Sequence, residues 1–334
     1  MKRHITAALA ALSLPAMAGV IGGTHDHMGP GMGPVVDHSN MPAAASGSAD
    51  LRIKPTGTAR TKQNRGSFRT TCTPSHFAHD DPIVWPGKAG ATHLHVFFGN
   101  TGTDAGSTAE SLMSAGNSTC RGGTGNRTAY WVPAMIDTRD GSPVVPYDIG
   151  VYYKGGGPGV APESIAYLPQ GLRMIAGSAK ASAPQSGAVV RWQCKSHVVK
   201  VTDTMHGPSI PLCPAGTMVM QEVFFPQCWD GVNLDSPDHK SHMAYPNYYT
   251  GCPASHPVAL PQITFNVHYL SGDWVPYGRL SSDMYPEDKP AGYSSHGDWW
   301  GAWDEDVMRA WVDNCDRAAF DCHGDLLGDG RALY

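Results

Sequence analysis

The stretch Gln262-Ile-Thr-Phe-Asn-Val-His-Tyr269 shows the pattern that decides the fold class. Ile263, Phe265 and Val267 alternate with polar residues. Because successive side chains of a β-strand point to opposite faces, one face of this segment is apolar and the other is polar. Such alternation is typical of a strand that packs one face against a core and turns the other toward water.

Similar runs recur on both sides of this segment, separated by turns rich in Gly and Pro. We expect strands in six further ranges: Leu94–Phe98, Tyr130–Ile136, Ile149–Tyr153, Leu172–Ile175, Val189–Cys194 and Met218–Phe225. The chain lacks the regular alternation of strands and helices that indicates a parallel α/β sheet. It therefore predicts a mainly β fold, an antiparallel β-sandwich or jelly-roll-like domain with long loops.

The composition agrees with this fold class. Among 334 residues, 39 are Gly and 27 are Pro, whereas charged residues make up only 16%. This profile argues against a coiled coil, a helical bundle or a charged disordered chain. The formal net charge of −5 provides no excess of cations for a phosphate backbone, so nucleic acid is not expected as a partner.

One helix is expected near the C-terminus, from about Asp298 to Cys315. Four apolar residues recur there at steps of three and four, as on one face of a helix: Trp300, Trp303, Val307 and Trp311. Asp298 is expected to cap the first turn or to orient the imidazole of His296.

Residues 1–18 predict a signal peptide. Lys2 and Arg3 precede an apolar run that ends in Ala16-Met17-Ala18, the small-x-small pattern of a cleavage site. The apolar run is short for a retained membrane anchor, which is the alternative. We therefore expect a secreted or periplasmic protein without a transmembrane anchor.

The cysteines agree with an oxidising compartment. Their number is even, and they stand at Cys72, Cys120, Cys194, Cys213, Cys228, Cys252, Cys315 and Cys322. An even number in an exported chain indicates disulfide bonds, and proximity suggests Cys228 with Cys252 and Cys315 with Cys322. A structural zinc site is the alternative, but the chain contains no C-x-x-C pair.

Residues 19–69 are expected to form a flexible tail, followed by one disulfide-bonded β-rich domain at 70–334. The tail has few large apolar residues to offset the entropy cost of folding. It carries imidazole and thioether side chains, which suit copper: His25, His27, Met28, Met32, His38 and Met41. A copper-binding tail and a low-complexity segment that happens to carry these residues are both open interpretations.

Three groups of residues could carry chemistry. His93 and His95 share one face of a predicted strand, which suits a metal site, an acid-base pair or two structural histidines. A second group follows in the loop at 228–246, where we expect catalytic side chains: Asp235, His239, His242 and Tyr245. A surface loop held by Cys228 and by Asx turns is the alternative there.

The third group is His296, just before the expected helix. Loops of a sandwich can meet at one end. We therefore expect a histidine-rich site that binds a divalent metal, copper or zinc, through His93, His95 and one of His242 or His296, with a position left open for water or substrate. Without a metal, His239 or His242 would act as a base with Tyr245 or Asp235.

These segments together resemble an exported family of fungal and bacterial proteins known as domain of unknown function nineteen ninety-six. The likeness spans about residues 78–316 and rests on the following motifs: Asp81-Pro-Ile-Val84, His93-x-His95-x-Phe97-x-Gly99, Phe224-Phe-Pro-x-Cys228-Trp-Asp-Gly231, Asp235-Ser-Pro-Asp-His-Lys-Ser-His-Met-Ala-Tyr-Pro246, Cys252-Pro253, His256-Pro-Val258, Leu260-Pro-Gln262 and His296-Gly-Asp298.

The resemblance implies export, and family members joined to sugar-binding modules point to extracellular or cell-wall polysaccharide. It implies no established reaction. Three functions are therefore open: a polysaccharide hydrolase or lyase, with or without a metal; a noncatalytic carbohydrate- or wall-binding protein whose aromatic rings stack on sugars; and a copper-binding factor that uses the N-terminal tail.

Overall fold

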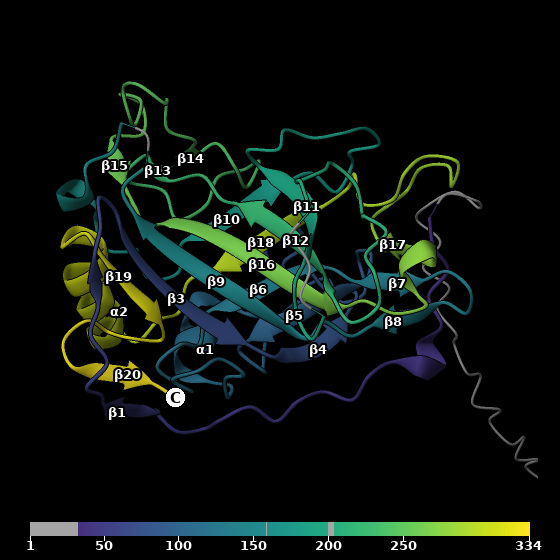
Figure 1. The fold of residues 1–334 in the computed structure, drawn as a ribbon, viewed down its shortest axis with the longest axis horizontal. Coiled ribbons are helices and arrows are strands. Elements are labelled where there is room, and N and C mark those ends of the chain that lie inside the picture. The colour runs from purple at the N-terminus through teal and green to yellow at the C-terminus, as the bar shows by residue number, and fades with distance from the viewer. Residues whose placement is uncertain (1–32, 158, 200–203) are drawn as a thin grey trace, which may run out of the picture. The chain divides into compact units, whose positions relative to one another are not determined.

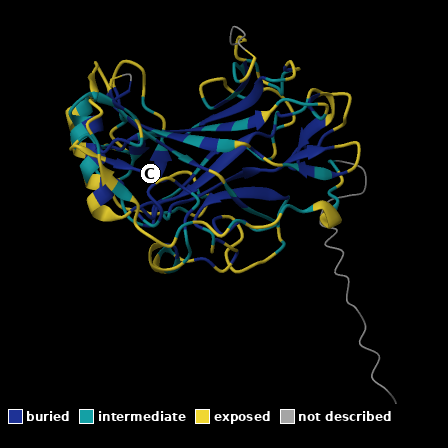
Figure 2. Ribbon diagram, turned by 60° about the horizontal axis from the view of Figure 1, so that its bottom comes forward, coloured by how far each residue is buried: buried dark blue, intermediate teal, exposed yellow. Residues whose placement is uncertain are grey.

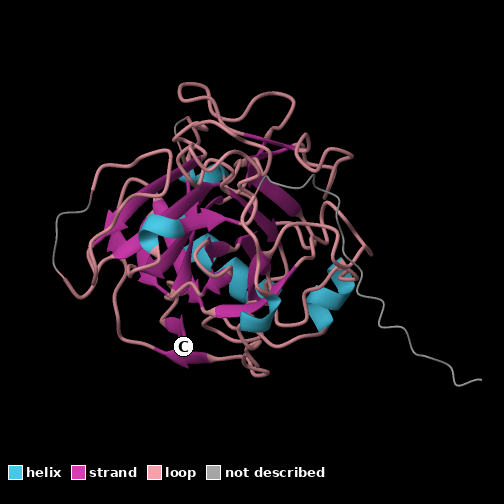
Figure 3. Ribbon diagram, turned by 90° about the vertical axis from the view of Figure 1, so that its right-hand side faces the viewer, coloured by secondary structure: helices cyan, strands magenta, loops and turns pink. Residues whose placement is uncertain are grey.

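The computed structural model describes residues 33–157, 159–199 and 204–334. Two large sheets overlap in the view of Figure 1 and pack face to face through a shared apolar core. Long loops surround the strands (Figure 3). The mainly β fold with antiparallel pairing is therefore confirmed, with one parallel pair, β3 and β19.

The seven-stranded sheet has the order β11 (Val190–Lys195), β12 (Met218–Phe224), β16 (Gln262–Leu270), β9 (Asp148–Gly155), β3 (Gly66–Cys72), β19 (Phe320–Gly324) and β2 (Thr61–Lys62). The five-stranded sheet has the order β10 (Arg173–Gly177), β18 (His296–Trp300), β6 (Ala129–Pro133), β5 (His95–Gly99) and β4 (Pro74–Ala78). All seven predicted strand ranges coincide with strands of these sheets, and the run at 130–136 continues into β7.

Smaller elements lie at the edges. Three sheets are formed by β17 (Gly278–Leu280), β7 (Met135–Asp137) and β8 (Ser142–Val144), by β14 (Met243–Ala244), β13 (Cys228–Trp229) and β15 (Val258–Ala259), and by β1 (Ile53–Pro55) and β20 (Arg331–Leu333). The helices are α1 (Ala109–Ser114) and α2 (Glu305–Trp311), with a π-helical turn η4 (Val312–Arg317) after α2 and short 3₁₀ turns η1 (His38–Asn40), η2 (Pro162–Ser164) and η3 (Val275–Tyr277).

The alternating segment at 262–269 behaves as its pattern predicts. Ile263, Phe265 and Val267 are fully buried between the sheets, whereas Asn266 and His268 lie on the outer face of β16. Figure 2 shows that the strands of both sheets are largely buried, with exposed residues concentrated in the loops.

The five-stranded sheet is buried on both faces. Val96 and Phe98 point into the main core, where the ring of Tyr130 contacts Phe265 at 5.7 Å. Alternate residues point the other way and form a second cluster, which includes Phe97, Trp131 and Trp300. Loops therefore cover the outer face of this sheet, and polar side chains on that face are removed from water.

Four disulfide bonds join the cysteines: Cys72–Cys120, Cys194–Cys213, Cys228–Cys252 and Cys315–Cys322. The two pairs expected from proximity are confirmed. Cys228–Cys252 closes the loop that carries the second group of predicted catalytic residues.

The predicted start of the C-terminal helix is wrong. Residues 296–300 form β18, and α2 begins at Glu305 with Asp304 as N-cap, whose carboxylate accepts the Val307 N–H at 3.1 Å. Trp299 packs in the main core and Trp300 in the outer cluster. The side chains of this segment therefore alternate between two faces, as in a strand, and do not follow the three- and four-residue spacing of a helix. The buried residues Trp303, Val307 and Trp311 do pack together at helical spacing.

The expected boundary between tail and domain, at residue 69, falls inside β3. Phe68 is fully buried there and β3 pairs with β9, so the last residues assigned to the tail belong to the folded domain. The predicted signal peptide and residues 19–32 lie outside the described residues.

In the described part of the chain, no helix is both long and apolar enough to cross a membrane.

Replacing Phe265 by Ala tests the shared core. We expect the free energy of unfolding to fall by about 3–5 kcal/mol, because the substitution removes a fully buried ring and leaves a cavity. Urea unfolding measures this change. Leu270→Ala at the exposed end of the same strand is the control and should change it by less than about 0.5 kcal/mol. Equal effects of the two substitutions would contradict this packing.

Candidate functional site

Strand register brings two distant histidines together on the outer face of the five-stranded sheet. His95 begins β5 and pairs with Pro133 of β6, while Asp298 of β18 pairs with Trp131 on the other edge of β6. When the register between β18 and β6 is continued by two residues, His296 lies beside Pro133, the residue that pairs with His95. Strands on either side of a third lie about 9.5 Å apart, and the two imidazoles bridge this gap with ring centroids 5.7 Å apart.

His93 completes a group of three imidazoles, which we call the histidine cluster. Its ring centroid lies 4.3 Å from that of His95 and 5.1 Å from that of His296. One ligand nitrogen from each ring lies within 4.8 Å of the others. Nitrogens bound tetrahedrally to one zinc ion at about 2.0–2.1 Å lie about 3.3–3.4 Å apart, so side-chain rotations would have to bring these atoms closer together to complete such a site.

Backbone carbonyls fix the tautomers of two of these rings. The Nδ1 of His95 donates to the carbonyl oxygen of Asp80 at 2.9 Å, and that of His296 donates to Ser294 at 2.8 Å. Because a carbonyl oxygen only accepts, Nδ1 carries the hydrogen in each ring and the neutral Nε2 keeps a lone pair. This is the tautomer that metal-binding histidines commonly adopt.

Burial keeps the cluster neutral. It lowers the pKa of His95 to about 4 and the pKa of His296 to about 3, and it lowers the pKa of His93 well below its usual range. The Nε2 atoms of His93 and His95 are buried and have no hydrogen-bond partner in the protein. Each unsatisfied buried group costs about 1–3 kcal/mol, which binding of a cation would offset.

Two buried carboxyl groups stand next to the cluster. Asp298 Oδ2 lies 4.0 Å from His296 Nε2 and has no hydrogen-bond partner in the protein, while Asp81 accepts the N–H groups of Ile83 and Val84. Burial raises the pKa of both groups. A bound cation would favour their ionised forms.

Asp298 is therefore not the helix N-cap that the sequence predicted. Asp298 stands two residues after His296, the same spacing as between His93 and His95. In a strand this spacing places both side chains on one face. The helical spacing of the tryptophans that follow favoured a helix here and obscured this pattern. Asp81 belongs to a motif quoted for the family resemblance but was not expected at the site.

A comparison with family models identifies the part of the chain that contains the histidine cluster. Residues 81–303 match the family model "Domain of unknown function (DUF1996)". The chain belongs to this family. The DUF1996 match contains all three histidines of the cluster and both neighbouring carboxyl groups. The searched curated proteins and solved structures contain no match to the chain.

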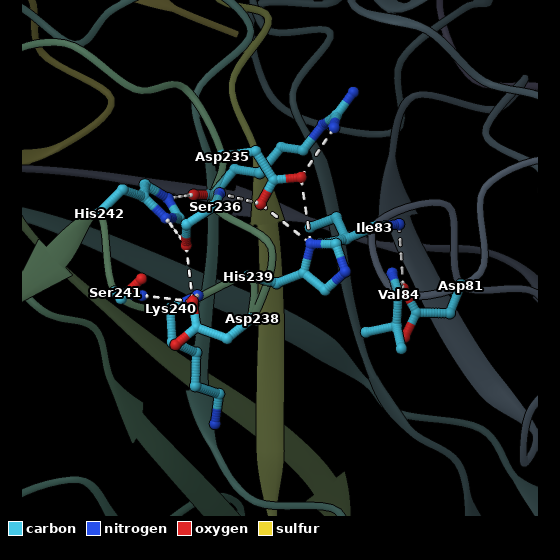
Figure 4. A network of polar contacts seen from close by, with 11 residues as sticks. Asp81, Ile83, Val84, Asp235, Ser236, Asp238, His239, Lys240, Ser241 and His242 are labelled. Atoms are coloured by element: carbon cyan, nitrogen blue, oxygen red, sulfur yellow. Dashed lines mark hydrogen bonds and ion pairs between the residues drawn. The ribbon is translucent and has the colours of Figure 1, made fainter.

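His239 lies in the DUF1996 loop beside the cluster. Its Nδ1 contacts both carboxylate oxygens of Asp235, at 3.0 and 3.1 Å, and Arg173 donates to the same carboxylate at 2.9 Å. Although burial alone would raise the pKa of Asp235, these hydrogen bonds lower it. Figure 4 shows the His239 ring between Asp235 and the segment that carries Asp81. Asp235 thus orients an imidazole next to the metal-binding candidates.

The structure does not bring His242 into the cluster. Its Nε2 donates to the carbonyl oxygen of Arg173 at 2.7 Å, and its Nδ1 lies 2.8 Å from the hydroxyl oxygen of Ser236, which donates its hydrogen to Asp238. Since both ring nitrogens already have protein partners, His242 attaches the loop to β10 and offers no lone pair to a metal.

Tyr245 also lies apart from the cluster. Its hydroxyl donates to the Phe224 carbonyl at 2.8 Å, and burial raises its pKa. It lines a cavity of about 230 Å³ together with Lys240 and Gly177. Gly177 pairs with His296 across the sheet, and Lys240 Nζ donates to the Gly177 carbonyl at 2.6 Å, but none of the three cluster histidines lines this cavity.

The cluster predicts that the metal-free protein loses stability in acid. Between about pH 6.5 and pH 4, His95 takes up a proton in the unfolded chain but not in the folded one, so the free energy of unfolding falls as the pH falls. At full shift this one residue contributes about 3 kcal/mol. Chemical unfolding in the presence of a chelator should show a shallower pH dependence for His95→Gln than for the unsubstituted protein.

His256→Gln is the matched control, because that ring lies outside the cluster and bonds to the Ser241 carbonyl. Asp298 has the opposite effect on stability, since its raised pKa favours folding at low pH. This effect is the same in the unsubstituted protein and in both variants, because all of them keep Asp298. The same slope for His95→Gln and for the unsubstituted protein would contradict the buried neutral cluster.

Proposed function

We propose that the chain is an exported protein that binds one divalent metal ion, copper or zinc, through His93, His95 and His296. The observation that carries this proposal is the convergence of three ligand nitrogens within 4.8 Å of one another in a buried site. Imidazole suits both metals. Four disulfide bonds support export, because such bonds persist in oxidising compartments.

Three histidines leave a further coordination position. Catalytic metal sites typically combine three protein ligands with one position for water or substrate. Asp298 and Asp81 supply negative charge that balances the cation.

We further propose that this site is catalytic and acts as a hydrolase or lyase on extracellular or cell-wall polysaccharide. The metal would act as a Lewis acid, and His239, oriented by Asp235, would transfer a proton. The polysaccharide class is supported by the family resemblance. His242 and Tyr245, whose polar atoms bond to other parts of the protein, are left out of this assignment.

Noncatalytic sugar binding through stacked aromatic rings has less support. Of the nine Trp residues, six are buried: Trp131, Trp192, Trp299, Trp300, Trp303 and Trp311. These rings pack in the protein core and are not available to stack on a sugar.

Metal analysis tests the site directly. The purified protein, loaded with copper or zinc and dialysed, should hold about one ion per chain, and the double variant His93→Ala/His95→Ala should hold none. His256→Ala removes an imidazole outside the cluster and should leave the metal content unchanged. Elemental analysis with circular dichroism as a folding check measures both. A fully folded double variant that keeps its metal would refute the site.

Substitution of His239 tests the catalytic assignment. His239→Gln should lower the release of reducing ends or unsaturated products from a panel of cell-wall polysaccharides by about 100-fold or more, because it removes the proton-transfer group. Metal content should stay constant. Asp235→Asn should act in the same direction and His256→Gln should not. Polymer binding without turnover in the metal-loaded protein would favour the noncatalytic alternative.

A further inference from the structure

His79 resembles the cluster histidines in its hydrogen bonding but lies outside the cluster. It follows directly after β4, and its Nδ1 donates to the Thr92 carbonyl at 2.9 Å. Its Nε2 is buried and has no hydrogen-bond partner in the protein. His79 therefore presents a lone pair in the same tautomer as His95 and His296.

Strand pairing places His79 next to the cluster. Ala78 pairs with His95 in the ladder between β4 and β5, and Thr92, which accepts the His79 hydrogen, directly precedes His93. His79 is thus the sequence neighbour of Ala78, which pairs with His95, and its ring bonds to Thr92, which is the sequence neighbour of His93.

His38 extends this arrangement to the surface. It is exposed at the start of η1, and its ring centroid lies 5.1 Å from that of His79. Met41, just after η1, packs against Leu94 and its apolar neighbours, which holds this segment near the start of β5. His38 is therefore exposed and in ring contact with His79, which follows directly after Ala78, the strand partner of His95.

This placement concerns two of the six imidazole and thioether residues of the expected flexible tail. His38 and Met41 lie against the domain, and the partly buried Met41 packs in an apolar cluster. The other four, His25, His27, Met28 and Met32, lie outside the described residues.

We propose that His38 and His79 form an uptake site that captures a copper or zinc ion and passes it to His93, His95 and His296. This inference rests on the proposed metal-binding function. A hydrated ion cannot enter a buried cluster without losing water, and a bare ion in the interior is costly. Exchange of one imidazole ligand for the next keeps the ion coordinated throughout its transfer.

Metal uptake kinetics test this path. The metal-free full chain is mixed with Cu(II) at neutral pH, and quenching of tryptophan fluorescence is followed by stopped flow, since Trp131 and Trp300 pack with Phe97 beside the cluster. His38→Gln and His79→Gln should each slow uptake at least about tenfold. The copper content at equilibrium should remain about one ion per chain.

Two controls match these variants. His76→Gln changes a histidine on β4 whose ring stacks on Phe97 with centroids 4.7 Å apart, and His256→Gln changes a half-buried histidine outside the histidine cluster. Both should take up copper at the rate of the unsubstituted protein. His38 is exposed, so His38→Gln decides the question even if His79→Gln folds poorly.

The outcomes separate this inference from the function on which it rests. If the unsubstituted protein binds no copper or zinc, the metal site and the uptake site fail together. If it binds one ion and His38→Gln takes it up at an unchanged rate, the uptake site alone is refuted. Loss of the ion at equilibrium in His38→Gln would also refute it, because His38 would then be a permanent ligand.

Discussion

The backbone ladder that joins β5, β6 and β18 holds His95 and His296 on either side of Pro133. The proposed chemistry depends on this register, because a slip of one residue in either strand would turn its histidine toward the aromatic core between the sheets. The core residues on the same strands oppose such a slip. Trp299 and Trp300 fit different environments on the two faces of β18, so exchanging them would cost packing on both sides.

The site combines rigid and looped parts. The three histidines belong to strands β5 and β18 or adjoin them, where the sheet fixes their backbone. Asp235 and His239 come from a loop, and His239 adopts a left-handed backbone conformation with φ of 57°, which is uncommon for a residue with a side chain. The proposed metal binding and the proposed proton transfer therefore depend on different structural elements, so a substitution in one element should affect one of them more than the other.

Local patterns in the sequence predicted much of the fold and part of the site. Alternation located β16, and the H-x-H spacing placed His93 and His95 on one face. Helical spacing gave a wrong start for the C-terminal helix. Trp300 is three residues before Trp303, as on a helix face, although β18 ends at Trp300 and the spacing there has no helical origin. β3 was missed, since its outward residues are polar and only Phe68 is large and apolar. The choice between His242 and His296 as a ligand depends on pairing between distant strands, which local patterns do not encode.

The Cys228–Cys252 bond has a consequence for the response of the protein to its redox environment. It closes the loop that carries Asp235 and His239, whereas no cysteine lies between His93 and His95 or next to His296. A reductant that opens this bond would free the loop from its covalent closure while the sheet continued to hold the imidazoles. In a thiol-rich environment, the proposed metal ligands would then keep their positions, whereas the ordered pair of Asp235 and His239 would be lost.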